Sequence, residues 1–266
     1  MTFDKFNDDW KFWIWDNVHR GSPKKELANI LLEKGFDKQL IINELGVPNI
    51  FEADFAPILD IKRLTQECKA KRISEDLNIF EVKHFLEPKE CEQMIEIIRE
   101  NCARSSVIDY DTGGNSISDF RTSSTANLYR KMGDIIGLVE DKLIKYLNIP
   151  EKFTEQIQGQ YYQVGQQFKP HFDTLFPTSD SMKEAIEKSG NRTWTAMIYL
   201  NDVEEGGETK FTKINYSAKP EKGKLLIWQD TQDGENINNS MHWGMPVIKG
   251  EKFVLTKWFR EKQYQF

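Results

Sequence analysis

The sequence predicts an α+β chain in which a small helical module precedes a larger, β-rich domain. Three observations support this prediction. The first 50 residues contain short amphipathic segments bounded by helix-capping residues and glycines. Residues 78–147 combine one strand-like run with two longer helical patterns. From residue 156 onward the chain consists of short β-rich segments separated by turns, a pattern that indicates a sandwich or barrel.

The composition indicates a folded protein of a reducing compartment. Hydrophobic residues make up 39% of the 266 residues and include 17 Phe and 7 Trp, which is enough for a core. The net charge of −6 is opposite to the basic footprint of a nucleic-acid-binding domain. No apolar run approaches 18 residues, and the chain does not begin with a basic and then apolar stretch. The odd, sparse cysteines favour free thiols; they are Cys68, Cys91 and Cys102. We therefore expect a cytoplasmic protein that binds neither nucleic acid nor a membrane.

Residues 1–50 are expected to form a module of three short helices. These helices are predicted over residues 8–18, 24–34 and 38–45. The first begins with acidic residues, which suit the positive end of a helix. Ser22 and Pro23 provide an N-cap and a first-turn proline for the second helix. Asp37 caps the third helix and Gly46 closes it.

Four aromatic residues gather in the first of these helices. They are Trp10, Phe12, Trp13 and Trp15. Packing in a core or against the other domain is the simplest explanation, because buried aromatic side chains are the commoner fate. A surface for a protein partner is the alternative, since aromatic residues are enriched at interfaces.

Residues 51–77 are mixed and charged, and we interpret them as a linker. The larger domain is expected over residues 78–266. It should begin with a strand near residues 80–85 and a helix that starts at Glu87-Pro88. A polar loop over 109–118 and a helix over 129–147 follow. The strands are then predicted over 158–164, 193–200, 208–212, 223–229, 238–243 and 251–260.

Two histidines and one aspartate form the strongest candidate site. His171 and Asp173 are two residues apart, so on a strand their side chains project from the same face. His242, 71 residues later, completes a set of two imidazoles and one carboxylate. Such a set holds non-haem Fe(II) and leaves other positions of the metal open. The same three side chains also suit a structural metal or a zinc hydrolase, although no HExxH helix is present.

Lys252 lies ten residues after His242 and is the candidate cation of the site. Alternation along the strand 251–260 places it on one face with Val254, Thr256 and Trp258, and Phe253, Leu255 and Phe259 on the other. A lysine that faces the interior of a barrel is costly unless an anion neutralises it. We therefore expect Lys252 to anchor an anionic co-substrate.

Residues 78–263 resemble the prolyl 4-hydroxylase branch of the Fe(II)- and 2-oxoglutarate-dependent dioxygenases. The matching pieces are Phe85-Leu-Glu-Pro-Lys-Glu-Cys91, Arg121-Thr-Ser, Tyr162-x-x-Gly-Gln, Pro170-His-Phe-Asp173, Arg192, Tyr199-Leu, Glu205-Gly-Gly-Glu-Thr209, His242-x3-Pro-Val-x2-Gly-x-Lys252 and Trp258. The resemblance implies a double-stranded β-helix, or jelly roll, with flanking helices. The N-terminal module has no counterpart in the matched part of the family.

The resemblance also implies roles for individual residues. Metal ligation and catalysis are implied for His171, Asp173 and His242, and 2-oxoglutarate binding for Lys252, Tyr162 and Thr209. Contact with the substrate is implied for Arg192, Trp258, Phe168, Arg121 and Ser123. Phe168 departs from the family pattern, because relatives often carry a tyrosine there.

The implied reaction is the hydroxylation of a prolyl residue in a peptide or protein. It consumes O₂ and decarboxylates 2-oxoglutarate to succinate and CO₂, with ascorbate as the reductant. The alternatives are the same chemistry on another side chain or small molecule, or a catalytically silent metal-binding interaction module. A zinc hydrolase would leave Lys252, Thr209 and Tyr162 unexplained, and a nucleic-acid demethylase would typically anchor its co-substrate with arginine. The oligomeric state is left open.

Overall fold

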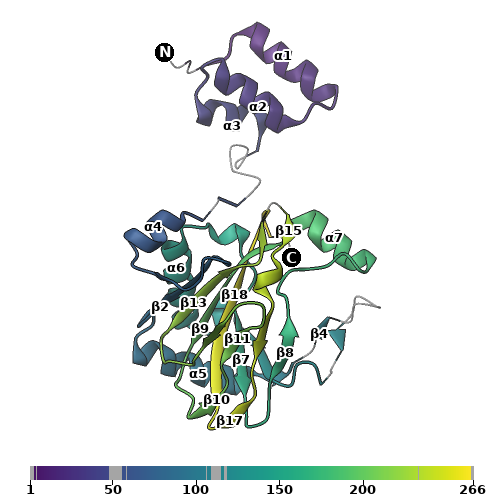
Figure 1. Cartoon of the computed structure of the whole chain (residues 1–266). Helices are drawn as coiled ribbons and strands as arrows, with labels where there is room; N and C mark the ends of the chain where they lie inside the picture. The colour runs from purple at the N-terminus through teal and green to yellow at the C-terminus, as the bar shows by residue number, and fades with distance from the viewer. Residues whose placement is uncertain are drawn as a thin grey trace. The chain divides into compact units, whose positions relative to one another are not determined.

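The computed structural model describes two compact units, Met1–Asp54 and Phe55–Phe266 (Figure 1). The described residues are 3, 5–47, 56–57, 59–105, 107–108, 115–116, 119–232 and 234–264. Most of the polar loop predicted over 109–118 therefore lies outside the described residues. Within the described residues, no helix combines the length and the apolar character needed to cross a membrane.

The first unit contains three helices close to the predicted ranges. They are α1 (Asp8–His19), α2 (Lys24–Glu33) and α3 (Lys38–Leu45). As predicted, the Asp37 side chain caps α3, and Gly46 closes it with a φ of +66°. Ser22 does not cap α2, because Pro23 occupies the N-cap position. The helices share a core of Phe6, Ile14, Leu27, Ala28, Leu31, Phe36, Ile41 and Leu45.

The four aromatic residues of α1 divide into two pairs. Trp10 and Trp13 are partly buried against the core of the helical unit. Phe12 and Trp15 remain 65% and 55% exposed, and their rings stack with centroids 6.1 Å apart. Core packing therefore explains one pair and leaves the other on the surface.

The second unit is built on two antiparallel sheets. The larger has the strand order β1 (Lys71–Arg72), β2 (Ile79–Val82), β13 (Leu225–Gln229), β9 (Arg192–Tyr199), β18 (Lys252–Arg260), β7 (Gln158–Tyr162), β6 (Ser124–Asn127) and β3 (Ala103–Arg104). The smaller has the order β12 (Tyr216–Ala218), β11 (Thr209–Phe211), β16 (His242–Gly244) and β8 (Phe168–His171). Both sheets contribute to one shared apolar cluster, for example Val254 from β18 and Phe211 from β11. The sheets therefore face each other as a sandwich.

Shorter elements complete the described part of this unit. The remaining strand pairs are β10 (Glu205–Gly206) with β17 (Val247–Lys249), β14 (Thr231–Gln232) with β15 (Glu235–Asn236), and β4 (Val107–Ile108) with β5 (Asn115–Ser116). Single turns of 3₁₀ helix occur at η1 (Arg130–Met132), η2 (Glu151–Phe153) and η3 (Asn238–Ser240). The helix α7 (Asp180–Ser189) precedes β9 and was not predicted.

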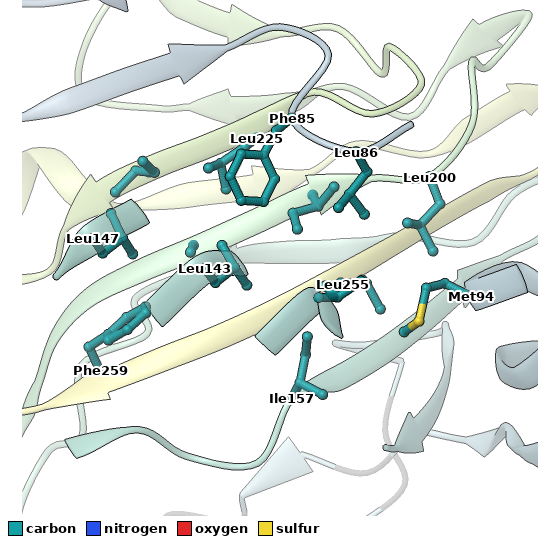
Figure 2. Close-up of a cluster of buried hydrophobic side chains, with 14 of the residues drawn as sticks. Phe85, Leu86, Met94, Leu143, Leu147, Ile157, Leu200, Leu225, Leu255 and Phe259 are labelled. Atoms are coloured by element: carbon teal, nitrogen blue, oxygen red, sulfur yellow. The ribbon is translucent and has the colours of Figure 1, made fainter. Parts of the chain in front are cut away.

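Helices cover the outer face of the larger sheet. The helices α5 (Pro88–Asn101) and α6 (Asp134–Leu147) pack there on the side chains of β18 that point away from the smaller sheet. Figure 2 shows Leu255 and Phe259 among Met94, Leu143 and Leu147 of these helices. Burial of each such side chain contributes roughly 1.5–3 kcal/mol to folding. The alternation predicted for β18 is therefore present, and it directs the opposite face of the strand into the sandwich.

Three predicted elements differ from the observed ones. The segment 51–77, predicted to be a linker, contributes α4 (Ile61–Gln66) and β1 to the second unit. It does so because Leu59 and Leu64 are buried in the core of that unit. Residues 51–55 lie outside the described part of the chain. The helix predicted over 129–147 begins as η1 and is interrupted at Gly133, whose φ is 167°. The strand predicted over 238–243 begins as η3, so only its end is extended.

Candidate active site

The register between β8 and β16 brings the two histidines together. His171 is the last residue of β8, His242 is the first residue of β16, and the two are paired directly across the sheet. Their ring centroids are 4.3 Å apart. Asp173 lies two residues beyond the end of β8, and its carboxylate oxygens are 3.8 Å from the Nε2 atom of each histidine. The closest ligand atoms of the three residues all lie within 4.8 Å of one another.

Backbone carbonyl groups determine that the Nδ1 atom of each imidazole carries a hydrogen. The Nδ1 atom of His171 lies 2.7 Å from the Lys169 carbonyl oxygen, and that of His242 lies 2.9 Å from the Ser240 carbonyl oxygen. A carbonyl oxygen only accepts, so each Nδ1 carries a hydrogen, and in the neutral imidazole the lone pair is then on Nε2. Burial, with the neighbouring His242, lowers the pKa of His171 to about 3. The ring is therefore neutral, as a metal ligand must be.

Asp173 is held by the neighbouring strand β9. Its Oδ2 atom accepts a hydrogen bond of 2.9 Å from the Thr195 hydroxyl, and its backbone carbonyl accepts one of 3.1 Å from Arg192. Burial opposes ionisation of this carboxyl, whereas the nearby Arg192 guanidinium favours it. Two imidazoles and one carboxylate, with Nε2 and carboxylate atoms turned toward a common point, fit a divalent metal such as Fe(II).

A small cavity of about 30 Å³ lies behind the three residues, between the sheets. Lys252, Tyr162 and Thr209 all line it, as the sequence predicts for a co-substrate pocket. The space holds about two water molecules. A five-carbon dicarboxylate is larger than this space.

Lys252 is 2% exposed and carries a cation into this inner cavity. Its ammonium group lies 4.9 Å from the centre of the Tyr162 ring, and Tyr162 is its register partner on β7. It forms no hydrogen bond or ion pair within the described part of the chain. Burial lowers the pKa of Lys252 to about 7. An anion in the cavity would therefore be strongly attracted to it.

The other two predicted co-substrate residues form hydrogen bonds inside the protein. The Tyr162 hydroxyl donates to Gln160 Oε1 at 2.7 Å. The Thr209 hydroxyl accepts from the Tyr199 hydroxyl at 2.8 Å. Gln160 and Tyr199 were not predicted as part of the site. Alternation along β7 from Tyr162 was a signal that could have identified Gln160, whereas no predicted pocket position on β9 shares the alternation of Tyr199.

A larger cleft of about 650 Å³ lies in front of the three residues. The cleft and the inner cavity share four lining residues, namely Phe168, His171, Asp173 and Trp258. Four of the five predicted substrate residues line the cleft: Arg121, Phe168, Arg192 and Trp258. Ser123 does not, because it is fully buried and contacts the Arg121 Nε atom at 3.2 Å from behind.

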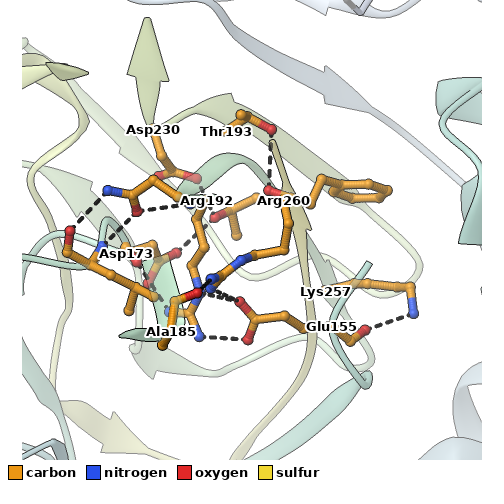
Figure 3. Close-up of polar contacts among 12 residues, drawn as sticks. Glu155, Asp173, Ala185, Arg192, Thr193, Asp230, Lys257 and Arg260 are labelled. Carbon is orange, nitrogen blue, oxygen red and sulfur yellow. Dashed lines mark hydrogen bonds and ion pairs between the residues drawn. The ribbon is translucent and has the colours of Figure 1, made fainter. Parts of the chain in front are cut away.

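Two arginines build opposite parts of the cleft. The Arg121 guanidinium lies 4.9 Å from the centre of the Phe168 ring, which in turn stacks on His171 at 3.5 Å. Arg192 forms two hydrogen bonds of 2.7 Å with the Glu155 carboxylate (Figure 3). Its guanidinium lies over the Trp258 ring, 4.0 Å from the ring centre. Arg192 is therefore held by the protein and contributes a fixed wall of the cleft.

Comparison with known proteins places this arrangement in a family. Residues 157–260 match the family model described as the 2OG-Fe(II) oxygenase superfamily. The chain is 32% identical over 232 residues to probable prolyl 4-hydroxylase 6 of Arabidopsis thaliana, covering 80% of this chain and 77% of that protein. It is 34% identical over 212 residues to prolyl 4-hydroxylase 2 of the same plant, covering 71% and 69%. The chain belongs to the prolyl 4-hydroxylase family.

A solved structure agrees with this membership. It is the viral collagen prolyl hydroxylase of Paramecium bursaria Chlorella virus-1 in its 2OG complex. The TM-score is 0.55 and the sequence identity 25%, over 69% of this chain and 96% of that one. Family membership confirms the jelly-roll α+β fold and the class of enzyme, a 2-oxoglutarate- and Fe(II)-dependent dioxygenase that uses O₂.

Several residues of this prolyl 4-hydroxylase-family site were not identified from the sequence. Glu155 binds Arg192 and also accepts from Arg260 at 3.0 Å, and Thr195 links Asp173 to Asp230. Figure 3 shows Glu155, Asp230 and the two arginines beside Asp173. These partners are separated by 22 residues or more in the sequence, and no local spacing rule connects them.

Proposed function

We propose that this chain hydroxylates a prolyl residue in a peptide or protein, with His171, Asp173 and His242 as the iron ligands. The observation that carries the proposal is the position of these ligand atoms between two spaces of different character. The inner cavity holds the buried cation Lys252, and the outer cleft is open and lined by aromatic rings and arginines. A small anion in the inner cavity and a large substrate in the outer cleft would therefore both adjoin His171 and Asp173.

The chain's own residues would prepare the reaction by binding and orientation. Bound iron and 2-oxoglutarate supply the oxidising chemistry. The His171 and His242 imidazoles present Nε2 atoms fixed by their carbonyl contacts, and Asp173 is fixed from β9. The Lys252 ammonium would bind the distal carboxylate of 2-oxoglutarate, and the hydroxyl groups of Tyr162 and Thr209 would orient it.

The outer cleft suits an extended, proline-containing segment. Aromatic rings from several elements line it, including Phe120, Tyr129, Phe168 and Trp258. Aromatic-lined grooves bind the preformed polyproline II conformation at low entropic cost. The fixed Arg192–Trp258 wall would position the reacting residue against the metal site.

Mass spectrometry of proline-containing peptides tests this function. We expect a +16 Da product, located on proline by tandem mass spectrometry, after incubation with Fe(II), 2-oxoglutarate, O₂ and ascorbate. The matched controls are His171→Ala, Asp173→Ala and His242→Ala, each of which should abolish 2-oxoglutarate turnover because an iron ligand is lost. Full turnover in one of these variants contradicts the ligand assignment. Oxygen placed only on another residue or on a small molecule would show the alternative substrate class.

Ascorbate and the cellular compartment belong to the same proposal. Family membership supports ascorbate as the reductant, and omission of ascorbate should shorten the linear phase of turnover. The free thiols Cys68, Cys91 and Cys102 support a reducing compartment such as the cytoplasm. Localisation of a tagged chain in its host tests this, and a secreted protein would contradict it.

A further inference from the structure

Two buried hydrogen bonds link the side chains of Asp173, Thr195 and Asp230. Thr195, in the middle of β9, has its Oγ1 atom 2.9 Å from Asp173 Oδ2 and 2.7 Å from Asp230 Oδ2. Asp230 directly follows β13, and both it and Thr195 have no exposed surface. One hydroxyl group thus joins two buried carboxyl groups.

The number of available hydrogens determines which group donates and which accepts in each of these two hydrogen bonds. Thr195 donates only one hydrogen bond, and ionised carboxylates only accept. With both carboxyl groups ionised, one of the two short contacts would lack a hydrogen, and two buried negative charges would repel each other. Asp173 is the ionised member, because a carboxyl group binds a metal as its carboxylate. Asp230 therefore donates its own hydrogen to Thr195, and Thr195 donates to Asp173.

The surroundings of Asp230 agree with a neutral carboxylic acid. Its Oδ1 atom is buried near the Trp228 indole without a hydrogen bond of ordinary geometry among the described residues, and no described residue forms an ion pair with it. The Oδ2 atom is thus the one that carries the hydrogen toward Thr195.

We propose that Thr195 and protonated Asp230 are positioning residues that hold the Asp173 carboxylate in its metal-binding orientation. The proposal rests on Asp173 being an iron ligand. It explains how a ligand beyond the end of β8 is kept in place, because the backbone ladder of the strand stops at His171. Strand β9 takes over this role by holding the backbone carbonyl of Asp173 through Arg192 and the carboxylate through Thr195.

Metal affinity measures this positioning without reference to turnover. Titration of the full chain with Mn(II), followed by the electron paramagnetic resonance of the free ion, gives the dissociation constant. Loss of an outer hydrogen-bond partner of a metal ligand typically weakens binding about 10- to 100-fold. We expect this loss for Thr195→Val, which keeps the shape and removes the donor, and for Asp230→Leu. Thr195→Ser and Asp230→Asn retain a hydrogen to donate, so both should stay within about threefold of wild type.

The pattern across the variants decides the proposal, and thermal melting shows which of them are folded. Wild-type affinity in folded Thr195→Val overturns the role of Thr195. A loss of Mn(II) affinity in Asp230→Asn as large as that in Asp230→Leu would show that the charge of Asp230 is needed. It would overturn the proposal that protonated Asp230 donates a hydrogen bond to Thr195. If Thr195→Val does not fold, Asp230→Asn decides alone: retained affinity supports the proposal and lost affinity overturns it. Asp173→Ala is the separate control, because unchanged affinity there would refute the ligand assignment itself.

Discussion

Lys252 is a buried ammonium group whose hydrogens remain available for an anion. Replacing it should therefore affect the binding of 2-oxoglutarate far more than the binding of iron. A charge-assisted hydrogen bond contributes about 1.5–3 kcal/mol, so Lys252→Ala should raise the apparent KM for 2-oxoglutarate about 10- to 100-fold. Steady-state kinetics measures this, and Mn(II) titration of the same variant is the control. Wild-type KM in the variant would place the anchor elsewhere.

The same lysine predicts a pH dependence. Its pKa in the folded protein is lowered to about 7 by burial, whereas the exposed side chain titrates near 10.5. The ammonium is therefore present below pH 7 and is lost as the pH rises through that value. The apparent KM for 2-oxoglutarate should be level below about pH 7 and rise by about tenfold per pH unit above it. Lys252→Ala should lack this rise; an equal rise in the variant would assign the titration to another group.

The candidate residues that the sequence identified share one property: each lies on a short motif with fixed spacing. His171 and Asp173 are separated by one residue, and strand alternation placed Lys252 on the inner face of β18. The partners that hold these residues, such as Glu155 and Thr195, come from distant segments. Their identity depends on which strands pair, and this information appears only when the sheet is formed.

The elements were predicted well where a single physical signal dominated. The alternation of β18 and the caps of α3 lie where the sequence placed them. The helix α7 was missed, although Ser179 caps it and Gly190 ends it with a φ of +68°; its short, largely polar sequence resembled a loop. The segment containing α4 was assigned to a linker, because its charges concealed the two leucines that anchor it.

At the level of elements, the carboxylate of Glu155 joins the end of η2 to β9 and β18. It accepts from Arg192 and Arg260, and all three side chains are largely buried. Removal of one partner from a buried ion pair costs roughly 3–5 kcal/mol, because the other charges lose their partner. Glu155→Gln should lower the free energy of unfolding by about this amount in urea denaturation. Asp180→Asn, which removes a solvent-exposed ion pair with Lys183, is the matched control and should change nothing measurable.

A stability of Glu155→Gln equal to wild type would mean that the two arginines do not depend on this carboxylate. The variant should also show reduced turnover of peptides, because Arg192 holds both the Trp258 wall and the Asp173 carbonyl. Loss of turnover without loss of stability would assign Glu155 to the reaction rather than to the fold.

At the scale of the whole molecule, each unit has its own apolar core. We therefore expect residues 55–266 to fold without the helical unit and to hydroxylate short peptides with unchanged kcat/KM. The exposed pair Phe12 and Trp15 distinguishes the two roles considered for the helical unit. If this unit recruits protein targets, the truncated enzyme loses kcat/KM on a full-length protein only. Phe12→Ser with Trp15→Ser in the full chain should then reproduce that selective loss, while equal losses on short and long substrates would favour a structural role.

The inner cavity and the outer cleft, which meet at the metal site, also determine the order in which ligands bind and leave. The inner cavity adjoins the outer cleft through Phe168 and Trp258, and buried residues such as Lys252 line its far side. A peptide in the cleft would therefore block the route to the cavity. Binding should be compulsorily ordered, with 2-oxoglutarate entering before the peptide and succinate leaving after it. A dead-end peptide should then inhibit uncompetitively against 2-oxoglutarate; competitive or mixed inhibition would reveal a second entrance.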